Sequence, residues 1–374
     1  MALNTVSSDR LSTNVKNTNF TAAEKQDLTD DILPLAGQLG NRNLIINGAM
    51  QVAQRGTSST ANGYGSVDRI HVGNGGVDEN PTHAQVDVAS GTTPYTLGFR
   101  KALKITNGNQ TSGAGAGDYM YMKYAFEAQD IANSGWNYLS SSSFITLSFY
   151  VKSSVAQSFK VYFHTFDGTS YLYPFETGSL SADTWTKVTK TIPGNSNLTF
   201  NNDNGSGLEL YIWPFIGTDY TASSVTEDAW STYASAARTK DATSTWYTTN
   251  DATLEITGVQ LEVGSVATDF EHKCYQEELY RCYRYYVQRG FEALMGSKSG
   301  STGFPRINYP VVMRTSPSTY INYDSTNGAM RNQNDGSKLT GISTYEHYDY
   351  GFASRGGGSV NVIYSSTYYA DAEL

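Results

Sequence analysis

Charged side chains are scarce in this sequence. Asp, Glu, Lys and Arg supply 16% of its 374 residues, against roughly 25% in a typical soluble protein. The net charge is −9 and no segment gathers Lys and Arg, which excludes the basic surface that a nucleic-acid partner requires. The low charge also argues against a coiled coil or a helical bundle, which would need many Glu, Lys and Arg residues.

Long apolar runs are missing as well. No stretch of about 18 apolar residues occurs, and residues 1–10 contain no apolar segment of the signal-peptide type. We therefore expect that the protein does not insert into a membrane. We also expect that it is synthesised in a cytosol. Cysteine is limited to Cys274 and Cys282. In one helix they would lie about 12 Å apart along the axis, too far for a disulfide, so both are expected to be reduced core residues.

Familiar catalytic motifs are absent too. The sequence has no Gly-x-Ser-x-Gly elbow, no His-Glu-x-x-His zinc helix and no phosphate-binding loop, and its five histidines are dispersed. We therefore predict that the protein is not an enzyme and uses no cofactor, while the residues identify no metal ligands. A carboxylate pair for glycan hydrolysis has no fixed spacing, so a glycan depolymerase remains an alternative.

Glycine and tyrosine are plentiful, at 35 and 28 residues, which favours β-structure with many turns. Between residues 145 and 151, apolar side chains alternate with Thr, Ser and Tyr, the period of a strand with one buried face. The apolar phase shifts at Gly258, which indicates a β-bulge. Residues 41–270 are therefore expected to form an antiparallel β-sandwich, with a jelly roll as the preferred form. The polar interval 217–250 is expected to be a functional loop carrying a short helix at 227–238.

Residues 1–40 differ from the rest, with one aromatic residue and no glycine before Gly37. Thr21 and Glu24 form a capping box that predicts a helix. Its apolar stripe is too thin to stabilise it alone, so we expect it to dock on the rest of this chain or on another protein, and in the second case it would be an attachment arm. A frayed terminus is an equal alternative. The residues expected to make the attachment are Leu28, Ile32, Leu33 and Leu35.

The C-terminal third has a different composition. Nine of the 25 residues from 268 to 292 are charged, and apolar residues fall at helical spacing, so an amphipathic connecting helix is predicted over 271–290. No tryptophan follows it, yet residues 275–374 hold 14 of the 28 tyrosines. Strand-like runs such as 308–313 and 351–353 predict a smaller, Tyr-rich β-domain over 291–374.

Several segments resemble the jelly-roll tail-fibre and receptor-binding proteins of tailed bacteriophages. They are Asn-Leu-Ile-Ile-Asn-Gly-Ala-Met at 43–50, the following 51–57, Val-Asp-Arg-Ile at 67–70, residues 259–270 with Gln-Leu-Glu, the Tyr-rich 277–286, and the closing 370–374. The sequence departs from that family at Ala49, often acidic or an amide there, and at Ile70, often Trp. The resemblance implies homotrimers in a virion appendage. Related carbohydrate-binding jelly rolls often hold calcium, whose ligands cannot be mapped onto these residues.

The residues of these segments can also be explained by structural roles within the fold. The Asn47-Gly48 pair allows a turn with a positive φ after a strand. Asp68 and Arg69 are expected to form a buried bidentate ion pair that ties a loop to a sheet.

Aromatic residues near the long interval are the remaining functional clue. Flat rings with a polar tip can stack on sugar faces, although most such rings simply fill cores. Trp213 is the first choice, because alternation with Leu210 and Ile212 turns it away from the apolar side. The full candidate glycan platform is Trp213, Trp230, Trp246, Trp185 and Tyr220.

These observations predict a structural virion protein of a tailed phage, assembled in the bacterial cytoplasm. The preferred form is a trimeric tail fibre whose residues 1–40 contact other virion proteins and which contacts the host surface, with glycan as a possible ligand. The alternatives are a depolymerase of host-surface glycan and a capsid-bound fibre or decoration protein. No residue pattern identifies the host receptor or the virion protein that receives the arm.

Overall fold

In a computed structural model of the chain, the described residues are 41–295, 297–299, 302–303, 306–321, 331–332, 340–357 and 362–374. The chain divides into two units, Met1–Arg42 and Asn43–Leu374. The expected attachment residues Leu28, Ile32, Leu33 and Leu35 lie outside the described residues. Every described helix and strand belongs to the second unit.

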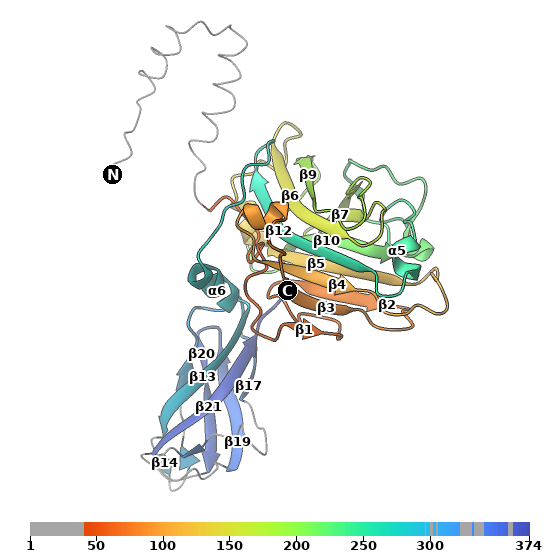
Figure 1. Ribbon diagram of the computed structural model, residues 1–374. Helices are drawn as coiled ribbons and strands as arrows, with labels where there is room; N and C mark the ends of the chain where they lie inside the picture. The colour runs from red at the N-terminus through yellow and green to blue at the C-terminus, as the bar shows by residue number, and fades with distance from the viewer. Residues whose placement is uncertain are drawn as a thin grey trace, which may run out of the picture. The chain divides into compact units, whose positions relative to one another are not determined.

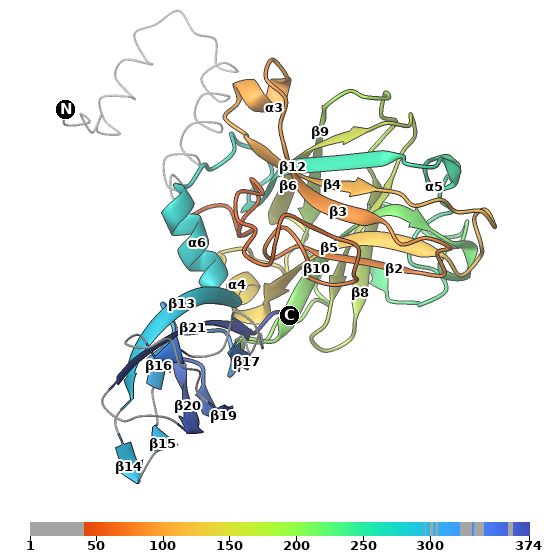
Figure 2. The same cartoon turned by 60° about the horizontal axis from the view of Figure 1, so that its bottom comes forward.

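Two six-stranded antiparallel sheets build a β-sandwich (Figures 1 and 2). The first has the order β1 (Ser58–Ser59), β3 (Thr82–Asp87), β4 (Lys101–Thr106), β12 (Thr253–Val263), β6 (Phe144–Ser153), β9 (Thr186–Pro193). The second has the order β11 (Ser231–Thr232), β8 (Tyr171–Glu176), β7 (Lys160–Thr165), β10 (Ser206–Ile216), β5 (Tyr119–Glu127), β2 (His71–Gly75). The predicted antiparallel sandwich is confirmed.

The core lies between these sheets, because every second side chain of a strand points toward the facing sheet. Ile145, Leu147 and Phe149 of β6 are buried there with Leu210 and Ile212 of β10. Burial of such apolar area, at about 25 cal/mol per Å², is the main force that holds the two sheets together.

The predicted bulge is present in β12. Its register against β6 shifts between Thr257 and Gln260, and Gly258 adopts a φ of +64°. A Cβ at this position would lie 2.6 Å from Cζ of Phe99. Both the positive φ and the close ring require glycine here.

Short helices interrupt the strands. They are α3 (Thr93–Thr96), α4 (Ala128–Ala132), the 3-10 helix η2 (Thr218–Tyr220) and α5 (Thr245–Thr248). The prediction of a helix at 227–238 is wrong, because this stretch contains only turns, irregular backbone and the two-residue strand β11. Its indole and tyrosine rings pack individually against the sandwich instead of forming one apolar helical stripe. No helix among the described residues is long and apolar enough to cross a membrane.

The connecting helix α6 spans Tyr275–Tyr283 and is shorter than the predicted 271–290. It stops because residues from Tyr286 onward pair with the end of the chain as a strand. Cys282 is buried as expected, but Cys274, at the helix N-cap, is exposed, which corrects its expected core position.

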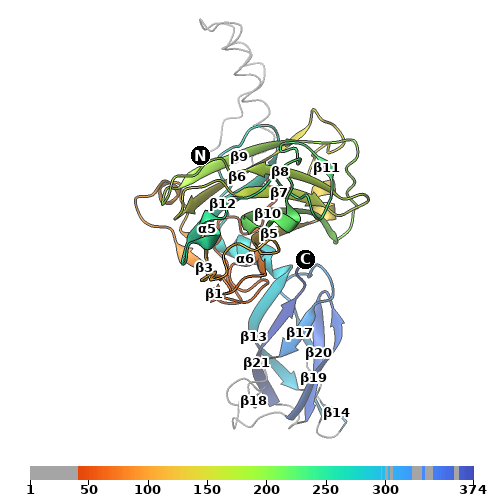
Figure 3. The ribbon, with the colours of Figure 1, turned by 90° about the vertical axis from the view of Figure 1, so that its right-hand side faces the viewer.

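Small sheets follow α6 (Figure 3). One contains β13 (Tyr286–Met295), β21 (Val362–Asp371), β17 (Ser318–Ile321) and β18 (Arg331–Asn332). The other contains β14 (Ser297–Ser299), β15 (Thr302–Gly303), β20 (Gly351–Gly357), β16 (Arg306–Asn308) and β19 (Thr340–Tyr348). The strand predicted at 351–353 is confirmed within β20. The run 308–313 is not a strand, because only its first residue belongs to β16.

The Asn47 turn has the predicted positive φ, at +62°. Its side-chain amide donates to the carbonyls of Val52 and Asp68, both at 2.9 Å. The residues of the resembling segment 43–50 therefore fix the backbone that leads into the sandwich.

The expected Asp68–Arg69 ion pair is wrong. Asp68 instead accepts hydrogen bonds from the backbone and side-chain nitrogens of Gln54, at 2.8 and 2.5 Å. Arg69 forms its ion pair with Glu373 and donates to the carbonyl of Ala125 at 2.6 Å. The arginine thus ties the end of the chain to β5 of the sandwich.

Candidate functional site

The outer face of the second sheet is lined with aromatic rings. On β5, Met120 and Met122 point into the core, so Tyr119 and Tyr121 point outward. The same alternation places outward-facing rings on three neighbouring strands. We define the aromatic face as His71 of β2, Tyr119 and Tyr121 of β5, Tyr162 and His164 of β7, and Tyr211 and Trp213 of β10.

Strand register brings these residues into rows. Lys123 of β5 lies opposite both His71 of β2 and Tyr211 of β10, and Tyr211 lies opposite Tyr162 of β7. Because facing residues on adjacent strands are close neighbours, one row of side chains crosses four strands. The antiparallel ladders hold these positions rigidly.

Glycines in β2 make room for two of the rings. Gly73 lies opposite Tyr121 and Gly75 lies opposite Tyr119. A Cβ on Gly73 would lie 2.6 Å from Oη of Tyr121, and one on Gly75 would lie 2.7 Å from Cε1 of Tyr119. The two rings therefore lie over bare backbone, which only glycine permits at this spacing.

Trp213 occupies the centre of the aromatic face. Its ring stacks on Tyr211 with centroids 5.5 Å apart and an interplanar angle of 13°. Tyr121 and Tyr162 flank it at centroid distances of 5.1 and 5.6 Å. Trp213 itself is only 2% exposed, whereas Tyr119, Tyr121 and Tyr211 are half-buried. The tyrosines are therefore the rings that a ligand could contact.

Residues of the connection between β10 and β12 pack on the aromatic face. Tyr220 meets Tyr119 edge-on at 5.6 Å, and Tyr233 stacks on His164 at 4.5 Å. The guanidinium carbon of Arg238 lies 4.7 Å from the Tyr220 centroid. The functional loop predicted at 217–250 thus contributes rings and one guanidinium to this surface.

Lys123 and Glu209 lie among the rings of the aromatic face and form an ion pair, so their opposite charges cancel. Lys123 Nζ lies 2.9 Å from Oε1 of Glu209, and the hydroxyl of Tyr211 donates to Oε2 of Glu209 at 2.6 Å. Burial raises the pKa of Tyr121 to about 12. Near neutral pH this phenol is protonated and can donate a hydrogen bond.

Both histidines of the aromatic face are neutral at pH 7. Burial, together with Lys123, lowers the pKa of His71 to about 4, and burial, together with Arg238, lowers that of His164 to about 4. Nδ1 of His71, Nε2 of His164 and Nε1 of Trp213 are buried and have no hydrogen-bond partner among the described residues. The face therefore combines neutral rings with unused polar atoms.

Of the predicted platform residues, the structure brings together Trp213 and Tyr220. Trp213 has the outward orientation that alternation predicts. The other three tryptophans lie elsewhere. Trp246 is fully buried between the sheets and donates to the carbonyl of Thr253 at 3.0 Å. Trp230 packs against the core and donates to the carbonyl of Pro193, and Trp185 packs on the other sheet.

Sequence reasoning missed most of the aromatic face. Its members His71, Tyr119, Tyr121, Tyr162, His164 and Tyr211 were not predicted, nor was Tyr233, which stacks on His164. The signal was present in the run Tyr-Met-Tyr-Met at 119–122, where tyrosines repeat at every second residue on the face opposite the methionines. No group of three or more His, Cys, Asp or Glu that could hold a metal occurs among the residues the structure describes.

No protein-family model matches the chain. A search of curated proteins finds no significant match. Among solved structures, the enzymatically active domain of bacteriophage CBA120 tailspike protein 4 is 9% identical, with a TM-score of 0.32 over 59% of this chain and 21% of that one.

Two further solved structures are carbohydrate-binding modules. The family 11 module from Clostridium thermocellum is 10% identical, with a TM-score of 0.26 over 57% of this chain and 98% of that one. The N-terminal cellulose-binding domain of Cellulomonas fimi β-1,4-glucanase C is 11% identical, with a TM-score of 0.27 over 58% and 99%. The chain thus has a distant structural similarity to such β-sandwiches and to a phage tailspike domain.

Proposed function

We propose that this protein is a structural component of a tailed-phage virion, a trimeric tail fibre that binds host-surface glycan through its aromatic face. Residues 1–40 attach it to another virion protein, the jelly-roll sandwich presents the face, and the Tyr-rich C-terminal part points outward. The chain is assembled in the bacterial cytoplasm and acts by binding without turnover. The virion context rests on the sequence resemblance, and the glycan ligand rests on the aromatic face.

The observation that carries the glycan proposal is the set of half-buried tyrosines around Trp213. Tyr119, Tyr121 and Tyr211 present rings on adjacent, hydrogen-bonded strands. Sugar faces carry C–H groups that stack on such rings, and their hydroxyls bond to the phenol groups at the edges. Little conformational entropy is lost on binding, because the rings are already held by one another and by Gly73 and Gly75.

The electrostatics favour recognition by stacking and hydrogen bonding over recognition by net charge. Lys123 and Glu209 neutralise each other, and His71 and His164 are uncharged at pH 7, so the charge that the surface presents is mainly that of the single guanidinium of Arg238. With a neutral glycan, binding should therefore depend only weakly on salt concentration between about 0.05 and 0.5 M, since one guanidinium has no opposite charge on such a ligand for salt to screen.

The test uses the purified full chain, fluorescently labelled, on cells of the phage's bacterial host. Tyr121→Ala and Tyr211→Ala should each reduce cell binding about tenfold, because each removes a stacking ring. Tyr280→Ala is the matched control, because this tyrosine is 47% exposed on α6 and its ring contacts Tyr283, which is not part of the aromatic face. Equal binding by all three variants would overturn the glycan proposal.

The virion proposal has its own test. Deletion of residues 1–40 should abolish incorporation into virions, and sedimentation should give a trimer at micromolar concentration. A monomer, together with unchanged incorporation of the deleted chain, would contradict the fibre account. Antibody labelling of the C-terminal part separates a tail position from the capsid position. Release of reducing ends from host polysaccharide would instead support the depolymerase.

A further inference from the structure

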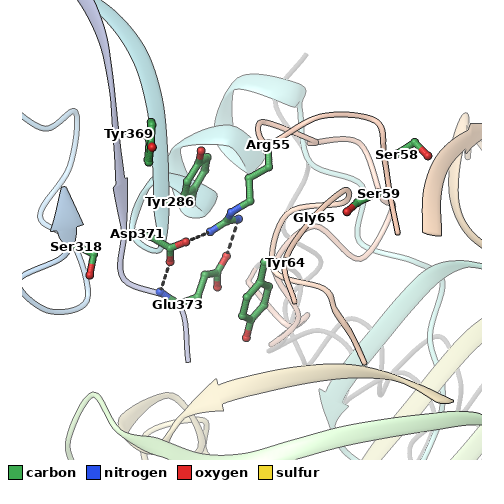
Figure 4. Close-up of a pocket in the computed structure, with 10 residues that line it drawn as sticks. All are labelled: Arg55, Ser58, Ser59, Tyr64, Gly65, Tyr286, Ser318, Tyr369, Asp371 and Glu373. Atoms are coloured by element: carbon green, nitrogen blue, oxygen red, sulfur yellow. Dashed lines mark hydrogen bonds and ion pairs between the residues drawn. The ribbon is translucent and has the colours of Figure 1, made fainter. Parts of the chain in front are cut away.

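A pocket lies beside the aromatic face, since its lining residue Tyr64 meets His71 edge-on with ring centroids 5.2 Å apart. It has a volume of about 640 Å³ and lies between the segment 55–65, the start of β13, the start of β17 and the end of β21 (Figure 4). This volume falls within the range of about 300 to 1,000 Å³ that is typical of small-ligand sites. Its charged and aromatic lining residues are Arg55, Tyr64, Tyr286, Tyr369, Asp371 and Glu373.

Arg55 holds the floor of the pocket in place. Its guanidinium lies 2.9 Å from Oδ2 of Asp371 and 3.3 Å from Oε1 of Glu373. It also stacks on Tyr286, with Cζ 3.5 Å from the ring centroid. Tyr64 donates from its hydroxyl to the carbonyl of Leu374 at 2.5 Å. These contacts preorganise the pocket before any ligand arrives.

The charges around Arg55 determine which ligands fit. Two carboxylates, of Asp371 and Glu373, share this one guanidinium, and Arg69 also pairs with Glu373. An anionic ligand would have to displace one of these carboxylates, which makes it a poor match. The Asp371 side chain is 42% exposed, and its oxygens retain lone pairs that can accept hydrogen bonds from hydroxyl groups.

The rim adds the other features that a sugar requires. Tyr369 is 36% exposed and offers ring surface for stacking. Ser58 and Ser318 are exposed at the opening and provide hydroxyls that donate or accept. Figure 4 shows the tyrosine and the two serines on different elements around the arginine.

We infer that this pocket binds one unit of a neutral saccharide, as a second carbohydrate site that adjoins the aromatic face but uses different residues. Asp371 accepts hydroxyl hydrogens of the sugar, Tyr369 contacts its apolar face, and the serines bond at the rim. The inference shares with the proposed function only the class of ligand, and each can fail without the other.

The experiment is saturation-transfer NMR of the full chain with the methyl glycosides of glucose, galactose and mannose, and with sodium glucuronate as the anionic probe. At least one neutral glycoside should receive saturation, and its signal should fall about fivefold or more in Ser318→Trp and in Ser58→Trp. Both substitutions fill the opening from exposed positions and leave Arg55 and its carboxylates unchanged. Ser141→Trp, in an exposed turn, is the control and should behave like the wild type.

Three results would overturn the inference. They are no saturation of any neutral glycoside, a signal that both pocket variants retain, or stronger saturation of glucuronate than of the neutral sugars. Tyr121→Ala separates the two sites, because it should reduce binding to host cells while leaving the signal that Ser318→Trp removes.

Discussion

Arg69 lies with its guanidinium carbon 3.4 Å from the centroid of the Tyr285 ring, and its side chain is 1% exposed. Tyr124 flanks the same guanidinium at 5.1 Å, and Glu373 supplies the opposite charge. Arg69, in the segment 67–70, thereby contacts Tyr285, just after α6, and Glu373, near the end of the chain.

Removing one partner of this buried ion pair should be costly. Arg69→Met leaves the Glu373 carboxylate buried without its main counter-ion, and we expect a loss of about 3 to 5 kcal/mol in the free energy of unfolding. Urea denaturation measures it. Lys101→Met is the control, because its pair with Asp87 has side chains 38% and 83% exposed, and such pairs contribute about 0 to 1 kcal/mol. Equal losses in the two variants would contradict the role of Arg69.

Asp68 should make stability depend on pH. Burial raises its pKa from 3.8 to about 6, despite hydrogen bonds from Gln54. Between these values the folded chain binds more protons than the unfolded chain, so this contribution to stability is present at low pH and is lost as the pH rises from about 4 to about 6. Asp68→Asn cannot titrate. The difference in unfolding free energy, wild type minus variant, should therefore fall across this window; a constant difference would refute the assignment.

The histidines of the aromatic face should remain neutral well below pH 7. Because burial lowers the pKa of His71 and of His164 to about 4, their imidazole proton shifts should stay constant between pH 7.5 and about 5.5. His71→Gln and His164→Gln assign the two resonances. Each of these pKa values is lower in the folded chain than in the unfolded chain. Both histidines therefore also contribute stability that is fully present above about pH 6.5 and is lost as the pH falls toward about 4. A titration midpoint near 6.5 for either ring would show that it is solvated.

Gly73 should control where the Tyr121 ring lies. Gly73→Ala places a Cβ against this ring, so the ring must move. We expect weaker host-cell binding, with a change in unfolding free energy of about 1 to 3 kcal/mol from the forced shift. Gly117→Ala is the matched glycine control, because its Cβ would meet only Asp219 Oδ2 at 3.4 Å, an ordinary contact. If Gly73→Ala binds cells as well as Gly117→Ala does, the position of Tyr121 is irrelevant to binding.

Local patterns were sufficient to predict the sandwich. Period-two alternation at 145–151 located β6 in the core, and the phase change at Gly258 located a bulge. The outward orientation of Trp213 followed from the same alternation. These features depend on the backbone of a single strand, so the sequence contains them directly.

Long-range contacts could not be predicted in the same way. Trp246 lies in the interior because the short helix that carries it, α5, packs on the core, and Arg69 pairs with Glu373, a residue more than 300 positions away. The aromatic face depends on which strands are neighbours, since Tyr121 meets Gly73 only through the register of β2 and β5. Such pairings are fixed by the topology of the whole sandwich.

The central claim is that the aromatic face binds glycan, and calorimetric titration with oligosaccharide fragments of the host's surface polysaccharide tests it most directly. The wild-type chain should bind, and Tyr121→Ala and Tyr211→Ala should each weaken binding about tenfold, or about 1.4 kcal/mol, while Tyr280→Ala leaves it unchanged. Wild-type affinity in both aromatic-face variants, or no binding by the wild-type chain, would contradict the account.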